Sequence, residues 1–418
     1  MDTRGADPGG KLVMVMPERA QAVLRLLRGY ATIAPTDLPE VLRREYESLQ
    51  ISHLTIYLAD LQQKQLVSVP DSRVEAPRTV PIDGTLAGWA YRTASPRITE
   101  DSMGRGLVLW LPLLDGVERL GVVGIQAPVL DARTVETCRA LVSLIALVLV
   151  DKAAYSDAYT MRQRLASMQT PSELVWAFLA PRIIGTDRFT SSAVLEPAYN
   201  LGGDAFDHST LDHTVHIGIF DSMGHDLAAG LVTSAALAAC RASRRAGAGL
   251  EQMAITIDEA VNEVFPDRYV TAVLSNLQTG TGSLEWVNCG HPTPLLIRDK
   301  EVLREALGQD PEPPLGLRNM KPGNGRRVSR FQMEPGDSVL LYTDGVTEAR
   351  SPSGSRFGEE RFTDFIIRAI AAGDPAPEAL RRLIHTILEH HGGELDDDAT
   401  IVLLEWHPFP PARSIPEA

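Results

Sequence analysis

The sequence has little of what marks secreted, nucleic-acid-binding or membrane proteins. Only three of its 418 residues are cysteines, and they lie far apart without a C-x-x-C pair, which argues against a disulfide framework or a cysteine-based zinc site. Lysine and arginine number 40 against 54 aspartate and glutamate residues. The resulting net charge of −14 argues against binding to nucleic acid or to an acidic membrane surface.

Long hydrophobic runs are also missing. The longest, Leu141 to Val150, is interrupted by Ser143 and is well short of the ~20 residues that a membrane crossing needs. The apolar stretch from Lys11 to Met16 is too short for the core of a secretion signal. We therefore expect a cytoplasmic protein that binds neither nucleic acid nor membranes.

The length of the chain points to more than one domain. At ~150 residues per domain, 418 residues suggest two or three, and a hydrophobic share of 44% is enough for buried cores although aromatic residues make up only 6%. We predict a disordered tail at 1–17, an α+β unit at 18–152, a helical linker at 153–180, a second α+β unit at 181–407 and a second tail at 408–418.

In the first unit, strands are predicted at His53–Leu58, Leu107–Leu114 and Leu120–Ile125. A helix predicted over Thr134–Val150 carries apolar residues at helical spacing, which favours packing in a core or a dimer. The polar segment that follows has no broad apolar face and is expected to form a helix that bridges the two units. Thr170 is expected to cap the next helix, with Pro171 in its first turn.

The second unit alternates strands and helices and is large enough to be an enzyme. Strands are predicted at Val215–Phe220, Tyr269–Leu277, Ser338–Tyr342 and Thr400–Glu405. Helices are predicted at Ala228–Arg245, Leu250–Val264, Glu359–Ala371 and Pro377–His390.

Aspartates recur beside glycines or other small residues at the predicted strand ends of this unit. They lie in the strings Gly202-Gly203-Asp204, Asp221-Ser222-Met223-Gly224, Thr343-Asp344-Gly345 and Asp397-Asp398-Ala399. If the polar stretch around Asp212 is the turn of a hairpin, antiparallel pairing places Asp204 opposite Asp221, so that two carboxylates face each other. Asp344 ends a predicted strand and Asp397 precedes one, so both are expected to reach one edge of a sheet.

Carboxylates held this close repel each other unless a cation neutralises them, so the pattern predicts bound metal. Oxygen ligands, with the backbone carbonyl of Ser222 among them, select hard ions such as Mg²⁺ or Mn²⁺. Two such ions about 3.5 to 4 Å apart could lower the pKa of a bridging water and direct the hydroxide at a phosphorus atom. The sequence therefore predicts hydrolysis of a phosphate ester, without a covalent nucleophile.

Several neighbouring residues have simpler explanations. His291 stands between a glycine and a proline and is expected to fix the structure of its loop, with a catalytic role as the alternative. A zinc site could instead use His208, His213, His216 and His225, but their spacing matches no helix-borne or finger-type pattern. The helix dipole alone accounts for Arg241, Arg244 and Arg245 at the end of a predicted helix.

The aspartate strings also give a resemblance to a known family. From about Leu174 to Trp406 the chain resembles the metal-dependent serine/threonine phosphatases of the PPM class, in the bacterial branch typified by stage II sporulation protein E and the stress-response sigma-factor regulators. The matching strings are Glu196 to Asp204, Asp221 to His225, Val287 to Pro292, Pro335 to Asp337, Leu341 to Ala349, Phe357 to Gly358 and Asp397 to Thr400. The resemblance implies an αββα sandwich with two Mn²⁺ or Mg²⁺ ions at one end of its sheets.

The resemblance further implies roles for single residues. Asp221 would bridge the two ions, Asp204 and the Ser222 carbonyl would bind one of them, and Asp344 and Asp397 would bind the other. Just outside these ligands, and supporting them, we expect Asp207, Asp398, Gly345 and His291. Asp226 stands where many members have glycine, and Phe220 where many have a small residue, but neither departure removes a ligand.

The first unit, at 18–152, resembles a GAF sensor domain, most clearly in Ile82 to Ala90 and in Leu111 to Gly124. Such domains hold small ligands or mediate dimers. No cyclic-nucleotide signature is visible, so the ligand is not identified. The helices at 151–180 are expected to pair in a homodimer and to transmit the state of the sensor.

The resulting hypothesis is a phosphoprotein phosphatase under the control of a GAF-like sensor. The usual substrates of the family are phosphoserine or phosphothreonine residues of small anti-sigma-factor antagonists. The alternative is a catalytically idle module of the same fold that binds a partner. A third possibility, a zinc hydrolase that uses the histidines, is not favoured by the sequence.

Overall fold

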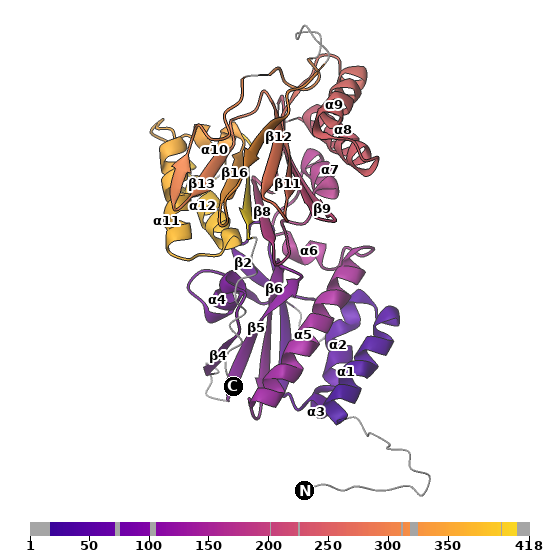
Figure 1. Ribbon diagram of the computed structural model, residues 1–418. Helices are drawn as coiled ribbons and strands as arrows, with labels where there is room; N and C mark the ends of the chain where they lie inside the picture. Colours follow the sequence, from indigo (N-terminus) through magenta and orange to yellow (C-terminus); the bar gives the residue numbers. More distant parts are fainter. Residues whose placement is uncertain are drawn as a thin grey trace, which may run out of the picture. The chain divides into compact units, whose positions relative to one another are not determined.

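A computed structural model of the chain describes residues 17–71, 76–100, 106–200, 202–224, 226–310, 312–317, 325–393 and 395–407. The chain divides into two compact units, Met1–Asp115 with Arg119–Gln163, and Gly116–Glu118 with Arg164–Ala418. Figure 1 labels many of the helices and strands of both. None of the helices in the described ranges is long and apolar enough to cross a membrane.

The first unit is built on a six-stranded sheet with the strand order β3-β2-β1-β6-β5-β4. Its strands are β1 (His53–Ala59), β2 (Gln65–Ser68), β3 (Thr79–Pro81), β4 (Arg97–Glu100), β5 (Leu107–Asp115) and β6 (Glu118–Ala127). Its helices are α1 (Glu18–Gly29), α2 (Leu38–Arg44), α3 (Tyr46–Leu49), α4 (Leu86–Thr93), α5 (Ala132–Ala153) and α6 (Thr160–Gln163).

Alternation along β1 shows which helices cover which face of this sheet. Successive side chains of a strand point to opposite faces. Leu54, Ile56 and Leu58 belong to a core with residues of α1, α2, α3 and α5. Tyr57 and Ala59 belong to a second core with residues of α4. Both faces of the sheet are therefore covered by helices.

The helix predicted over Thr134–Val150 is confirmed as α5, and the side chain of Asp131 caps it by accepting a 2.7 Å hydrogen bond from the N–H of Thr134. The bridging segment does not form one continuous helix. After α5 it contains only the single turn α6 and then irregular backbone up to α7 (Thr170–Phe178). A polar segment gains little from packing, and so short a helix is not stable alone. Thr170 begins α7 rather than capping it.

The second unit contains two antiparallel sheets, β15-β12-β11-β10-β9 and β14-β13-β16-β17-β8-β7. Its strands are β7 (Ile183–Gly185), β8 (Phe189–Glu196), β9 (Asp204–Leu211), β10 (Thr214–Ser222), β11 (Val270–Gln278), β12 (Ser283–Cys289), β13 (Leu295–Arg298), β14 (Glu301–Leu303), β15 (Ser329–Gln332), β16 (Ser338–Tyr342) and β17 (Ala399–Trp406). Besides α7, its helices are α8 (Leu227–Arg245), α9 (Leu250–Val264), α10 (Asp344–Glu348), α11 (Glu359–Ala371) and α12 (Ala376–His391).

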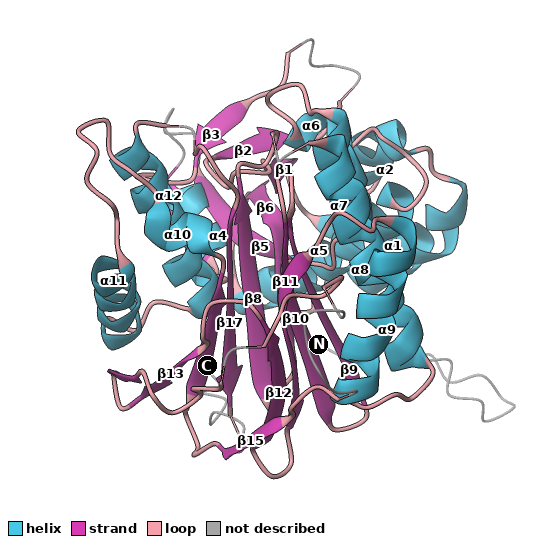
Figure 2. Cartoon of the chain, turned by 90° about the horizontal axis from the view of Figure 1, so that it is seen from above, coloured by secondary structure: helices cyan, strands magenta, loops and turns pink. Residues whose placement is uncertain are grey.

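Side-chain alternation on β17 separates the two faces of its sheet. Val402 and Leu404 belong to the core that also contains Val215 and residues of α8 and α9. Ile401 and Leu403 belong instead to a core with residues of α11 and α12. Figure 2 shows α8 and α9 on one side of these strands and α11 and α12 on the other. The second unit is thus an α+β fold in which two sheets lie between helices.

The predicted β9–β10 hairpin is confirmed, with Asp204 directly opposite Asp221 in the register. The turn passes through Asp212, whose φ of 51° lies in the left-handed region that aspartate tolerates better than most residues. One facing pair of carboxylates therefore follows from the local geometry of the chain.

Candidate functional site

The predicted ligands stand at the strand ends of both sheets in the second unit. Asp204 begins β9 and Asp221 lies near the end of β10. Asp344, the first residue of α10, follows β16 after Thr343, and Asp397 lies two residues before β17. The Thr343 hydroxyl donates to Asp204 across the two sheets, which brings these strand ends together, and the charges of Asp344 and Asp397 help to raise the pKa of Asp221.

Asp204 is held by residues of the opposite sheet. Its Oδ2 atom accepts a 2.8 Å hydrogen bond from the hydroxyl of Thr343 and another of 2.8 Å from the hydroxyl of Thr400. Neither threonine was predicted as a site residue, although each is part of a string that resembles the phosphatase family. Their hydroxyls tie the start of β9 to β16 and β17, and so orient the Asp204 carboxylate.

Asp398 supports the same strand end through the backbone. Its Oδ2 atom accepts hydrogen bonds from the N–H groups of Gly202, Gly203 and Asp204, at 2.9, 2.7 and 3.1 Å. Asp398 is only 5% exposed, and these three N–H donors stabilise its buried carboxylate. Asp398 therefore fixes the backbone that leads into Asp204.

Two glycines allow backbone contacts that any side chain would block. A Cβ atom on Gly203 would lie 2.5 Å from the carbonyl oxygen of Ser222, and one on Gly345 would lie 1.9 Å from the carbonyl oxygen of Asp398. Both distances are far below van der Waals contact, so only glycine fits at either position. The Ser222 carbonyl, which was predicted as a ligand, thus lies against the Gly203 backbone.

Burial and mutual repulsion raise the pKa values of these carboxyl groups. Burial raises the pKa of Asp221 to about 7, and three neighbouring aspartates add to the shift. Burial, followed by the charges of Asp221 and Asp398, raises the pKa of Asp204 well above its usual value. Burial also raises the pKa of Asp398 to about 6, against the lowering effect of its three N–H donors.

This donor set fits a pair of hard divalent cations. In the described ranges, Asp204, Asp221, Asp344 and Asp397 form no ion pair with a lysine, arginine or histidine. Clustered carboxylates without a positive partner are costly, and oxygen donors suit Mg²⁺ or Mn²⁺. Among described residues no three of these four place an oxygen within 4.8 Å of one another. This wide spacing suits a two-ion site, because ligands around two ions about 3.5 to 4 Å apart are spread more widely than ligands around a single ion.

Asp207 lies apart from this group. Three residues after Asp204 on the same strand, it faces the opposite side of the sheet, toward α8. Its carboxylate accepts hydrogen bonds of 2.9 and 2.7 Å from Arg241 and one of 2.5 Å from Arg244. Burial alone would raise the pKa of Asp207, but the two guanidinium groups hold it below its usual value. The structure thus gives Arg241 and Arg244 a specific partner beyond the helix dipole, and does not bring Asp207 to the predicted ligands.

Replacing Asp207 with alanine should lower the free energy of unfolding by ~3 kcal/mol, because it leaves two largely buried arginines without their partner. Urea denaturation followed by circular dichroism measures the change. The matched control is Arg245→Ala, an exposed arginine at the end of the same helix, which should change the free energy by less than ~0.5 kcal/mol. Equal stability of the two variants would contradict a structural role for the Asp207 ion pairs.

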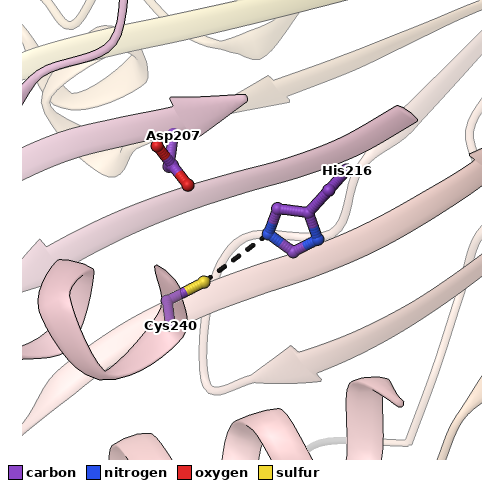
Figure 3. Close-up of side chains that lie close together, drawn as sticks. All are labelled: Asp207, His216 and Cys240. Atoms are coloured by element: carbon purple, nitrogen blue, oxygen red, sulfur yellow. Dashed lines mark hydrogen bonds between the residues drawn. The ribbon is translucent and has the colours of Figure 1, made fainter. Parts of the chain in front are cut away.

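Asp207, His216 and Cys240 form the one group of described side chains whose potential metal-binding atoms all lie within 4.8 Å of one another (Figure 3). The Sγ atom of Cys240 lies 3.5 Å from Nε2 of His216, whose Nδ1 lies 3.0 Å from Oδ1 of Asn276. Since both guanidinium groups already engage the Asp207 carboxylate, hydrogen bonding explains this buried cluster better than metal ligation does. This cluster therefore does not support the zinc site of the alternative hypothesis. His225, another histidine considered for that site, lies outside the described residues.

Acid should destabilise the second unit through His216. Burial lowers the pKa of His216 to about 4, whereas an unfolded histidine titrates near ~6.5. Between these two values protons bind the unfolded chain preferentially, so the free energy of unfolding falls as the pH falls. By pH 5 the loss from this residue amounts to about 2 kcal/mol. Metal-free His216→Gln should lose about that much less than wild type between pH 7.5 and pH 5 in urea denaturation, and equal losses would disprove the titration.

Comparison with known families decides what this unit is. Residues 211–407 match the family model described as stage II sporulation protein E (SpoIIE). The second unit contains a SpoIIE-type domain. This assignment confirms the resemblance to the PPM class, and the matched range contains Asp221, Asp344 and Asp397 but begins after Asp204.

The relatives of this SpoIIE-type domain are distant. Protein IcfG of Synechocystis sp. is 27% identical over 135 residues, which cover 32% of this chain and 20% of IcfG. The phosphoserine phosphatase RsbP of Bacillus subtilis is 25% identical over 226 residues, which cover 53% of each chain. The phosphoserine phosphatase RsbU of the same organism is 22% identical over 260 residues, which cover 60% of this chain and 74% of RsbU. The chain thus spans less than two thirds of IcfG and of RsbP.

Two solved structures that are similar to the chain have TM-scores below 0.5. The RsbU and RsbW domains of Rv1364c from Mycobacterium tuberculosis have a TM-score of 0.46 and 22% identity, over 55% of this chain and 63% of that one. The SiaA-PP2C domain of Pseudomonas aeruginosa has a TM-score of 0.45 and 22% identity, over 52% of this chain and 85% of that one. The family assignment rests on the match at 211–407.

Proposed function

We propose that the chain is a metal-dependent protein serine/threonine phosphatase, which hydrolyses phosphoserine or phosphothreonine on a regulatory protein of the anti-sigma-factor antagonist type. The group of mutually repelling carboxylates at the ends of the two sheets carries this proposal. RsbP and RsbU, which are similar over more than half of this chain, are phosphoserine phosphatases by name. Two sheets between helices support the expected αββα sandwich.

Different residues of the chain would have different roles in hydrolysis. Two Mn²⁺ or Mg²⁺ ions would be held by Asp204, Asp221, Asp344, Asp397 and the carbonyl of Ser222, with Asp221 between the ions. When bound, the ions supply an activated water and neutralise charge on the phosphoryl group. Thr343 and Thr400 keep the Asp204 carboxylate pointed at the site, and Asp398 keeps the backbone before it in place. No side chain needs to bond to phosphorus.

We also propose that the first unit acts as a GAF-like sensor. A cavity of about 40 Å³ lies in this unit, and its lining includes His53, Asp71 and Arg78. That space holds a few waters or a very small ligand, and a larger pocket of about 270 Å³ in the same unit is lined by residues that include Pro96, Leu111 and Val142, so a signal of either size has a place in this unit. Comparing the phosphatase activity of the full chain with that of a His53→Leu variant tests whether the smaller cavity controls hydrolysis.

Phosphate release from a phosphoserine peptide and from a phosphorylated anti-sigma-factor antagonist tests the main proposal. The full chain, freed of metal, should be inactive, become active with Mn²⁺ or Mg²⁺, and lose activity again in EDTA. Zn²⁺ alone should not restore it. A chain that binds Mn²⁺ in calorimetry but releases no phosphate from either substrate would instead be the idle, partner-binding module.

A further inference from the structure

His291 contacts the strand pair that carries Asp221. It lies in the loop after β12 and is only 7% exposed. Its Nδ1 atom lies 2.8 Å from Oγ1 of Thr271 on β11. Thr271 is paired directly with Asp221 in the sheet, and its hydroxyl acts to lower the pKa of Asp221, as a donor to that carboxylate does. A line of polar contacts thus runs from the His291 ring through Thr271 to Asp221.

The single hydroxyl proton of Thr271 sets the direction of this line of contacts. When Asp221 is ionised, as a metal ligand must be, it only accepts hydrogen bonds, so the Thr271 hydroxyl donates to it. The Nδ1 atom of His291 must then carry a proton and donate to Thr271 Oγ1, an assignment that follows from the bonding partners. Burial keeps the ring neutral by lowering the pKa of His291 to about 3.

The other ring nitrogen of His291, Nε2, is buried and has no hydrogen-bond partner among the described residues. The loop itself holds the ring in place, because the Asn288 side chain donates to the His291 carbonyl and accepts from the His291 N–H, both at 2.9 Å. The position of His291 is therefore set without a metal ion.

We infer that His291 is a positioning residue of the metal centre, which orients the Asp221 carboxylate through Thr271. The inference rests on the proposed function, because it concerns the residues proposed to hold the ions. Groups that orient metal ligands in this way typically contribute about 10–100-fold to metal affinity or activity. His291 itself touches neither substrate nor ion.

Isothermal titration of the metal-free full chain with Mn²⁺ tests the inference. His291→Leu removes the donor at similar size, and Thr271→Val removes only the hydroxyl. Each should weaken Mn²⁺ binding about 10-fold or more. Because His291 and Thr271 act through the same line of contacts, the double variant should bind Mn²⁺ only slightly more weakly than either single variant. His291→Asn, which retains an N–H donor near the Nδ1 position, should recover part of the loss. With p-nitrophenyl phosphate, kcat should fall while KM stays within about twofold.

His216 is a buried histidine whose side chain lies on the opposite face of the sheet from Asp221 and Thr271. The matched control, His216→Gln, should therefore bind Mn²⁺ like the wild type. A folded His291→Leu or Thr271→Val variant with wild-type Mn²⁺ affinity would overturn the inference, as would a double variant whose loss is the product of the single losses. If His291→Leu does not fold, the Mn²⁺ affinity of Thr271→Val alone tests the inference. A wild type that binds Mn²⁺ but hydrolyses nothing rejects the phosphatase proposal and leaves this binding test valid, whereas a wild type that binds no Mn²⁺ rejects both.

Discussion

An Asp221→Asn variant should lose Mn²⁺-dependent hydrolysis of a phosphoserine peptide by more than about 100-fold while it keeps its fold. Losing a group that merely supports a ligand costs about 10–100-fold, and Asp221 is proposed to touch both ions. Without metal, the substitution removes one of several repelling charges, so the thermal midpoint should stay equal or rise. Phosphate release and thermal unfolding of the metal-free protein measure the two effects.

Asp212→Asn is the matched control for this substitution. Asp212 is exposed at the tip of the β9–β10 hairpin, and asparagine readily adopts its φ of 51°. Activity and midpoint should both stay at the wild-type level. Hydrolysis by Asp221→Asn at the wild-type rate would remove Asp221 from the mechanism, and a midpoint lowered together with activity would assign the loss to unfolding.

A Gly345→Ala variant should weaken both the fold of the second unit and its binding of Mn²⁺. The new Cβ would lie 1.9 Å from the Asp398 carbonyl oxygen, a backbone atom that cannot rotate away. Either α10 or the start of β17 must therefore move, which displaces Asp344 or the loop with Asp397. We expect a loss of about 2–3 kcal/mol in the free energy of unfolding. Mn²⁺ affinity should fall more than about 10-fold.

Gly280→Ala provides the comparison, because a Cβ there meets nothing within 4 Å. It should change the free energy of unfolding by less than ~0.5 kcal/mol and leave Mn²⁺ binding unchanged. Urea denaturation and calorimetry are the measurements. A Gly345→Ala protein as stable as Gly280→Ala, with unaltered Mn²⁺ affinity, would show that the close approach of Gly345 to Asp398 is not required.

Much of the second unit was predictable because its helices have strong local signals. The predicted helices at Leu250–Val264 and Glu359–Ala371 coincide with α9 and α11. In contrast, β8 was not predicted. Ser191 and Ser192 interrupt its apolar pattern, and Ser191 is tolerated in the core because its hydroxyl pairs with Nδ1 of His208, 3.0 Å away on the other sheet. That partner cannot be found from local spacing.

The sequence already contained the information that places Asp207 away from Asp204. Three residues separate it from Asp204, and the period of two along a strand already places the two side chains on opposite faces. The role expected for Asp207 followed the family resemblance instead of this alternation. The two arginines of α8 that lie on the Asp207 face are distant along the chain, so the local sequence does not predict them.

The sequence by itself determined which acidic residues could serve as ligands, the hard-ion chemistry of their oxygens, and the facing of Asp204 and Asp221, because hairpin symmetry is a local property of the chain. Tertiary structure alone decided what orients them: Thr343 and Thr400 on Asp204, and His291 through Thr271 on Asp221. These partners are 20 to 196 residues apart along the chain. Packing of the two sheets, driven by burial of their shared apolar faces, brings Thr343 and Thr400 to Asp204, whereas strand pairing within one sheet brings Thr271 and the His291 loop to Asp221.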